Sequence, residues 1–255
     1  MIENLYTNTS ISIAAHRGYK SAYPENTLLA FKEAMDQGAD MIEFDLRMSK
    51  DKHVMIIHDE TLDRTTNGSG EISNYMLAEL KELDAGSWFA PPFEGLKIPT
   101  LIELCDLLKS YPNVYLNVEV KKSVHAKEVV DKTVELLKSY NYLSRCVFTC
   151  FDADIIAYMY ETYNLKTQGF LEEVMENFEK GSNGTYSKMW AIGISMDLLT
   201  PSVVKKCKEI GLRVGCYCPD NYKQVYYALG CDVSLFTCNN LKPAMSVRRQ
   251  NVPIS

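Results

Sequence analysis

The sequence lacks any apolar run that approaches the roughly 18–20 residues of a membrane span, so we expect no stable insertion into a membrane. Positive charge is also scarce, because 27 Lys and Arg residues stand against 33 Asp and Glu residues and give a formal net charge of −6. No basic stripe is present to neutralise a nucleic-acid backbone or an anionic membrane surface. We therefore expect no nucleic-acid partner, and any phosphate recognition must be local.

The N-terminus, MIENLYTNTS, has neither the basic segment nor the apolar segment of a secretory signal, so we expect a cytoplasmic protein. The eight cysteines are then expected to be free thiols, since that compartment is reducing. Several lie in apolar runs, where cysteine behaves as a small hydrophobic residue. Cys216 and Cys218, with Cys238 nearby, leave a soft-metal or redox site open, although their spacing matches no standard zinc pattern.

Apolar segments alternate with segments of helical period along the chain, a pattern typical of a parallel sheet built from βα units. The predicted strands cover residues 12–15, 41–46, 114–120, 146–150, 166–170, 190–195, 213–217 and 233–236. The predicted helices cover residues 27–37, 100–110, 126–140, 152–163, 201–210, 222–229 and 242–248. Eight strands in 255 residues predict an α/β protein with a single domain over residues 1–255, a closed (β/α)8 TIM barrel.

Residues 59–99 depart from this alternation of strands and helices and form a segment too long for a simple connection. They follow a short extra strand over 53–58 and contain a turn-rich TTNGSG, a short helix around 76–83 and the aromatic segment WFAPPF. We predict a small insertion after the second strand, packed over one edge of the barrel mouth. Its aromatic side chains either form an apolar wall for a substrate or simply pack the insertion onto the barrel.

Two of the predicted strands carry carboxylates within apolar runs. Glu43 and Asp45 lie two residues apart in MIEFDL, so their side chains share one face of an extended strand. Buried together, they repel each other and lose hydration unless a positive charge lies between them. Glu119, in NVYLNVEVK, lies on another buried strand and is followed by Lys121. Ligands of parallel α/β proteins bind at the carboxyl ends of the strands, so we expect these groups to meet there.

Oxygen ligands favour a hard cation, so the three carboxylates predict a site for one divalent cation, Mg²⁺ or Ca²⁺. Such a cation beside Arg17 and Lys121 suits an anionic substrate with non-bridging oxygens, such as a phosphate ester. His16 and His58, each at the end of a predicted strand, would supply a general base for an attacking hydroxyl and a general acid for a departing alkoxide. The sequence does not assign these two roles. His53 and His125 have no such neighbours in the sequence, and we expect them on the surface.

Seven motifs occur in order: HRG at 16–18, PENT at 24–27, IEFDL at 42–46, HD at 58–59, RTTNGSG at 64–70, IPTL at 98–101 and VEVK at 118–121. Together they resemble the glycerophosphodiester phosphodiesterase family. The resemblance implies a TIM barrel with an insertion after the second strand, and metal-dependent hydrolysis of small glycerophosphodiesters to glycerol 3-phosphate and an alcohol. It also implies roles for seven residues: His16 and His58 as the acid–base pair, Arg17 and Lys121 as phosphate contacts, and Glu43, Asp45 and Glu119 as metal ligands.

The resemblance further implies a two-step route, in which the glycerol hydroxyl attacks phosphorus, expels the alcohol and leaves a cyclic phosphate that water opens. Pro24, Glu25 and Asn26, in the PENT motif, are expected to shape the first loop, and Glu25 is expected to add a contact behind the site. The C-terminal half departs from the family pattern, because CYCP at 216–219 stands where many relatives have Trp-Thr-Val-Asn, and Thr237–Cys238 replaces the usual Thr-Asp. These differences bear on substrate preference.

Three other functions remain alternatives to this one. A lysophospholipase D-like enzyme would need an apolar groove for an acyl chain, and the WFAPPF segment keeps that reading open. A non-catalytic barrel that binds phosphorylated ligands would be favoured by the loss of a histidine or a ligand, and none is missing. The three carboxylates count against a phosphatidylinositol phospholipase C-like lyase, which need not carry such a metal site.

Overall fold

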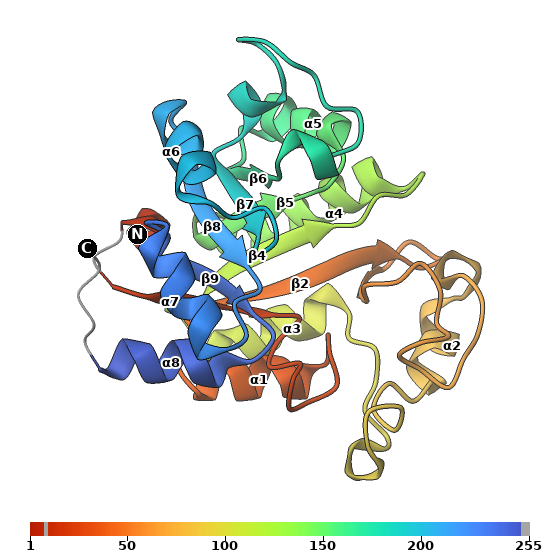
Figure 1. The fold of residues 1–255 in the computed structure, drawn as a ribbon. Coiled ribbons are helices and arrows are strands. Elements are labelled where there is room, and N and C mark those ends of the chain that lie inside the picture. The colour runs from red at the N-terminus through yellow and green to blue at the C-terminus, as the bar shows by residue number, and fades with distance from the viewer. Residues whose placement is uncertain (8–9, 251–255) are drawn as a thin grey trace.

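The structure is a computed structural model that describes residues 1–7 and 10–250. Its strands are β1 (Ser12–His16), β2 (Met41–Met48), β3 (Val54–Ile56), β4 (Tyr115–Val120), β5 (Cys146–Thr149), β6 (Thr167–Gly169), β7 (Ala191–Ser195), β8 (Arg213–Tyr217) and β9 (Leu235–Cys238). All except β3 run parallel, and the barrel closes because β1 pairs with both β2 and β9 (Figure 1). The predicted (β/α)8 barrel is confirmed.

Helices surround the barrel (Figure 1) and most of them separate consecutive strands. They are α1 (Leu28–Asp36), α3 (Leu101–Leu107), α4 (Ala126–Ser139), α5 (Ala153–Tyr163), α6 (Pro201–Glu209), α7 (Tyr222–Gly230) and α8 (Leu241–Arg249). Side-chain caps start several of them; Thr100, for example, accepts from the backbone N–H of Glu103, whose carboxylate accepts in return from the N–H of Thr100. In the described part of the chain, β6 and β7 are joined only by irregular backbone and the short 3-10 segments Glu172–Val174 and Thr185–Lys188.

The inside of the barrel changes character along its axis. At the amino ends of the strands it is filled by apolar side chains and closed from outside by the N-terminal 3-10 helix Ile2–Tyr6, in a cluster that includes Ile2, Leu5, Ala14, Met41, Val147 and Leu235. At the carboxyl ends the buried side chains include Glu43, Asp45 and Glu119. Within residues 1–7 and 10–250, charged groups converge at this end of the barrel, so it is the end where a ligand fits.

The insertion follows β2 and has its own small core. β3 pairs antiparallel with β2, and residues 59–99 then form the short helix α2 (Leu77–Glu82) and several turns. Apolar side chains of this segment and of β3 pack together: Met55, Ile57, Leu62, Ile72, Leu80, Ala85 and Ile98. The insertion lies beyond the carboxyl end of β2 (Figure 1), as the sequence predicts.

No helix within residues 1–7 and 10–250 combines the length and the apolar character that a membrane crossing requires.

Candidate active site

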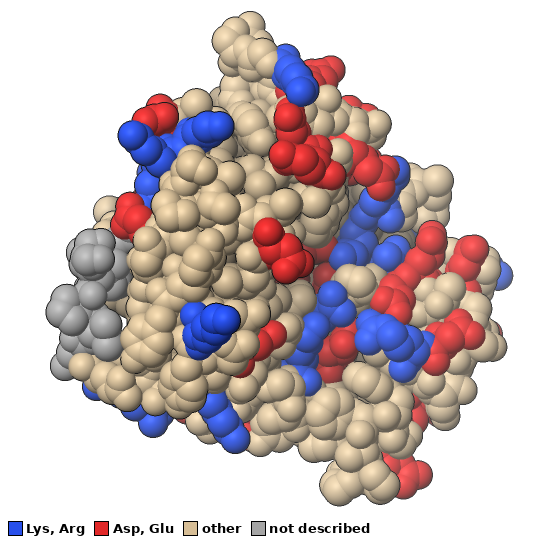
Figure 2. Space-filling model, in the orientation of Figure 1, with Lys and Arg blue, Asp and Glu red and all other residues tan. Residues whose placement is uncertain are grey.

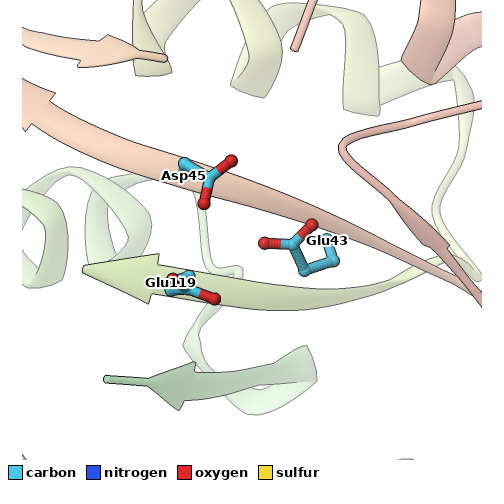
Figure 3. Close-up of side chains that lie close together, drawn as sticks. All are labelled: Glu43, Asp45 and Glu119. Atoms are coloured by element: carbon cyan, nitrogen blue, oxygen red, sulfur yellow. The ribbon is translucent and has the colours of Figure 1, made fainter. Parts of the chain in front are cut away.

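Three carboxylates meet at the carboxyl ends of β2 and β4. In the parallel register Asp45 lies beside Glu119, while Glu43 lies beside His16 of β1. One oxygen from each carboxylate lies within 4.8 Å of the other two, and Figure 3 shows the side chains converging between the two strands. The alternation of side chains along a strand, from which the site was predicted, therefore also brings the carboxylates together in the structure.

The chemistry of these carboxylates fits a hard divalent cation. Oε1 of Glu43 and Oδ1 of Asp45 are buried and accept no hydrogen bond, although a buried acceptor without a partner is costly. Burial, with the nearby charges of Asp45 and Glu119, raises the pKa of Glu43 well above its ordinary value. Burial and Asp45 also raise the pKa of Glu119. Oxygen-only ligands with unused lone pairs are what Mg²⁺ and Ca²⁺ select.

Two cations flank the carboxylates. Lys121 donates to Oε1 of Glu119 over 2.5 Å, and its Nζ lies 3.4 Å from Oδ1 of Asp45. Nε of Arg17 lies 3.3 Å from Oδ2 of Asp45. Burial alone would raise the pKa of Asp45, but Lys121 and Arg17 lower it below its ordinary value. Asp45 and the two cations are thus held together even before any ligand binds.

The turn after β1 places Arg17 at the site. Its φ of 55° lets the backbone N–H donate to Oε2 of Glu43 over 2.7 Å. The next residue, Gly18, has φ 78°, and a Cβ there would lie 2.7 Å from the carbonyl carbon of Ala30. Only glycine fits this close approach, which explains the glycine of the HRG motif. Glu25, expected behind the site, accepts from Nη1 of Arg17 over 2.9 Å.

His16 is held by an amide. Its Nδ1 lies 2.6 Å from Oδ1 of Asn239, whose Nδ2 donates to Asp220 over 2.5 Å. An ionised carboxylate only accepts, so Asp220 fixes the orientation of the amide, and the amide oxygen requires a proton on Nδ1 of His16. The other ring nitrogen, Nε2, faces Glu43 at 3.9 Å. Burial, aided by nearby cations, lowers the pKa of His16 to about 3 and favours the neutral imidazole.

His58 is held by a carboxylate. Its Nδ1 lies 2.6 Å from Oδ1 of Asp59, and its backbone carbonyl accepts from Nε of Arg47 over 2.8 Å. Burial lowers the pKa of His58, although the charge of Asp45 opposes the shift. The two histidines of the predicted site therefore have different partners, one neutral and one anionic.

A pocket of about 150 Å³ lies between these groups. Six of the seven predicted site residues line it, and Asp45 contacts two of the six from behind. The opposite wall is aromatic: Phe151 stacks on Phe170 with ring centroids 3.6 Å apart, and Tyr217 meets Phe170 edge-on at 5.5 Å. The sequence analysis missed the two phenylalanines, although Phe170 directly follows β6 and Phe151 lies two residues after the end of β5, at the same end of the barrel.

The aromatic side chains of the WFAPPF segment do not line this pocket. Trp88 and Phe89 pack edge-on, and Phe93 contacts Tyr23 of the first loop at 5.8 Å between ring centroids. These contacts favour the alternative in which the segment packs the insertion onto the barrel.

All eight cysteines are free, as predicted. Sγ of Cys218 lies 3.6 Å from Nδ1 of His16, and burial raises the pKa of Cys218 to about 12, so it stays a thiol. Among the described residues, the three carboxylates are the one cluster of His, Cys, Asp or Glu spaced for a metal, so the structure gives no support to a soft-metal site at Cys216 and Cys238. His53, whose side chain is 43% exposed, lies outside the pocket, as expected.

A model of the glycerophosphoryl diester phosphodiesterase family matches residues 16–241 of the chain. A probable glycerophosphodiester phosphodiesterase 1 of Mycobacterium tuberculosis is 30% identical over 231 residues, which cover 84% of this chain and 83% of that protein. A glycerophosphodiester phosphodiesterase of Caldanaerobacter subterraneus is 42% identical over 141 residues, or 55% of this chain and 58% of the relative. The chain spans about half the length, 50–58%, of this and two other curated bacterial relatives.

Among solved structures, an Oleispira antarctica phosphodiesterase in complex with the product sn-glycerol-3-phosphate matches with a TM-score of 0.82 and 25% identity. The match covers 93% of this chain and 97% of the other. The segment matched by the family model contains every residue predicted for the site.

Proposed function

Since the chain belongs to the glycerophosphodiester phosphodiesterase family, we propose that it is an enzyme that hydrolyses glycerophosphodiesters to glycerol 3-phosphate and an alcohol. The observation that carries the proposal is the convergence of three carboxylates, two cations and two differently partnered histidines around one pocket. A phosphodiester presents one anionic phosphoryl group, which needs positive charge beside it, and one leaving alkoxide, which needs a proton donor. A cytoplasmic location, the lack of a nucleic-acid partner and a single domain over residues 1–255 stay predictions from the sequence.

In this proposal Arg17 and Lys121 bind the non-bridging phosphoryl oxygens, while Glu43, Asp45 and Glu119 hold one Mg²⁺ or Ca²⁺ ion. The cation supplies positive charge where negative charge develops on the phosphoryl group. Arg17 and Lys121 are already held at fixed distances from Asp45, so little reorganisation is needed when the substrate binds.

The partners of the two histidines favour different roles for them. Asn239 keeps the proton of neutral His16 on Nδ1, which leaves Nε2 free to accept the proton of an attacking glycerol hydroxyl. Burial lowers the pKa of His58, but Asp59 opposes that shift and stabilises the protonated form, which suits His58 to give a proton to the departing alkoxide. In the second step His58 would take a proton from water as water opens the cyclic phosphate, and His16 would return its proton to the glycerol oxygen.

The pocket favours deacylated substrates over lysophospholipids. About 150 Å³ accommodates a phosphoryl group and a short polyol, and the aromatic wall in the pocket consists of Phe151, Phe170 and Tyr217. The WFAPPF segment, which would have lined an acyl groove, packs elsewhere.

The proposed activity is tested by coupled detection of glycerol 3-phosphate from glycerophosphocholine and glycerophosphoethanolamine, with Mg²⁺, Ca²⁺ or EDTA present. We expect release that EDTA abolishes and one of the cations restores. Choline, the product common to both substrates, should be released more slowly from lysophosphatidylcholine than from glycerophosphocholine. Release that EDTA leaves unchanged would contradict the metal role, and no release with any cation would contradict the activity.

Replacing Glu119 with glutamine should raise the cation concentration needed for half-maximal rate, by roughly tenfold or more, because an amide oxygen is a weaker ligand than a carboxylate. The measurement is a titration of the initial rate with Mg²⁺ or Ca²⁺. Glu128→Gln, which changes a carboxylate that is 39% exposed and paired with Lys52, is the matched control. If the Glu119 variant titrates like the control, Glu119 is not a ligand.

A further inference from the structure

Arg64 belongs to the insertion, in the turn-rich segment between β3 and α2, and joins two loops of the site. Its Nε and Nη2 donate to Asp59 over 2.6 and 3.1 Å. Its Nη1 and Nη2 donate to Glu25 over 3.0 and 2.8 Å. All three guanidinium nitrogens are therefore engaged, and the two carboxylates they hold lie 34 residues apart in the sequence (59 − 25).

Each of these carboxylates also holds a group that faces the pocket. Asp59 is bound to Nδ1 of His58, and Glu25 is bound to Nη1 of Arg17. An unbroken chain of charged hydrogen bonds thus runs from His58 through Asp59, Arg64 and Glu25 to Arg17. Such bonds are shorter and stronger than neutral ones, and a bidentate guanidinium also fixes the angle between its partners.

We propose that Arg64 is a positioning residue that sets the orientation of His58 and of Arg17 together, so that one side chain of the insertion aligns the proton donor with the phosphate contact. The inference rests on the function proposed above. Figure 2 shows Lys, Arg, Asp and Glu side chains gathered where the insertion meets the barrel, while much of the same face over α7 carries few charges.

A purely structural role explains Arg64 less well. The insertion packs through its own apolar cluster, in which Leu62, Ile72 and Leu80 are almost fully buried. Arg64 is not part of that cluster, and its side chain is 43% exposed. Ion pairs this exposed add little to the free energy of unfolding. Glu25, in contrast, is only 9% exposed, so its bond to Arg17 is shielded from water.

The test compares Arg64→Ala and Arg64→Lys with Lys97→Ala. This control removes another cation of the insertion, one that donates to the backbone carbonyl of Glu82. We expect Arg64→Ala to lower kcat/KM roughly 10–100-fold, as losses of supporting partners do, with a lower kcat through His58 and a higher KM through Arg17. Added guanidinium ion should restore part of the rate of Arg64→Ala. Arg64→Lys should be less active than the native protein, because an ammonium group lacks the planar, bidentate geometry of a guanidinium. The melting temperature should stay near that of the control.

The double variant Arg64→Ala with Asp59→Asn should show a fold-loss of kcat/KM smaller than the product of the two single fold-losses, because both substitutions act through His58. Arg64→Ala with kcat and KM within about twofold of the control would overturn the proposal. A second readout does not need turnover: in ¹⁵N-histidine-labelled protein, the Nδ1–H resonance of His58 should shift in Arg64→Ala and not in Lys97→Ala. If the native protein released no glycerol 3-phosphate, the proposed function would fall, whereas an unshifted resonance would overturn the role of Arg64.

Discussion

Alanine in place of either His16 or His58 should lower kcat by roughly 10²–10⁴-fold, the usual contribution of one acid–base group. The variant at His16 loses the nitrogen that accepts the proton of the attacking hydroxyl, and the variant at His58 loses the donor for the leaving group. The measurement is the initial rate of glycerol 3-phosphate release at saturating glycerophosphoethanolamine and cation, with a thermal melt to show that each variant is folded. A near-normal rate in either variant would remove that residue from the mechanism.

The two roles can be separated with a substrate whose leaving group needs no proton. On the p-nitrophenyl ester of glycerol 3-phosphate, the loss caused by His58→Ala should shrink, whereas the loss caused by His16→Ala should persist. His53→Ala, which changes a half-exposed histidine outside the pocket, should be unaffected on both substrates. If the leaving group instead rescues His16→Ala, the two assignments are reversed.

Glutamine in place of Glu43 should lower activity by on the order of 10²-fold or more at cation concentrations that saturate the native protein, because a ligand is lost. It should also stabilise the metal-free protein. Burial, with Asp45 and Glu119, raises the pKa of Glu43 above the ordinary 4.5, so the folded state keeps a proton that the unfolded chain releases. Stability without metal therefore falls as the pH rises above about 4.5, and glutamine removes this loss.

Melting temperatures in EDTA at pH 4.5 and pH 8 test this sign. We expect Glu43→Gln to melt above the native protein at pH 8, by about 2–4 °C for each kcal/mol regained, and nearly together with it at pH 4.5. Mg²⁺ or Ca²⁺ should raise the melting temperature of the native protein at pH 8 and leave the variant almost unchanged. A variant that melts below the native protein in EDTA at pH 8 would contradict the account of the three carboxylates.

Much of the fold follows from local pattern. Strands buried on both faces read as apolar runs, and the predicted strand over 41–46 differs from β2 only by two residues at its end. The carboxylates were found for the same reason, since alternation along a strand determines which side chains share a face. The connection between β6 and β7 is polar and without helical period, and in the described part of the chain it forms irregular backbone with two short 3-10 segments.

The partners that hold the site could not be predicted in this way. Asn239 contacts His16 across 223 residues of sequence, and Arg64 contacts Glu25 across 39. Both contacts join segments that are brought together only by closure of the barrel and docking of the insertion. A spacing rule describes one strand or one helix and carries no information on which loops become neighbours. The contact between Asp59 and His58, by contrast, is local, because the two residues are adjacent in the sequence.

The central claim is that this pocket cleaves the bond between phosphorus and the alcohol oxygen and leaves phosphate on glycerol. The most direct measurement is ³¹P NMR of glycerophosphocholine incubated with the protein and the activating cation. The account predicts that the diester signal is replaced by that of glycerol 3-phosphate, with the cyclic phosphate visible at most briefly, and that EDTA prevents the change. The appearance of phosphocholine, or a diester signal that persists with every cation, would contradict it.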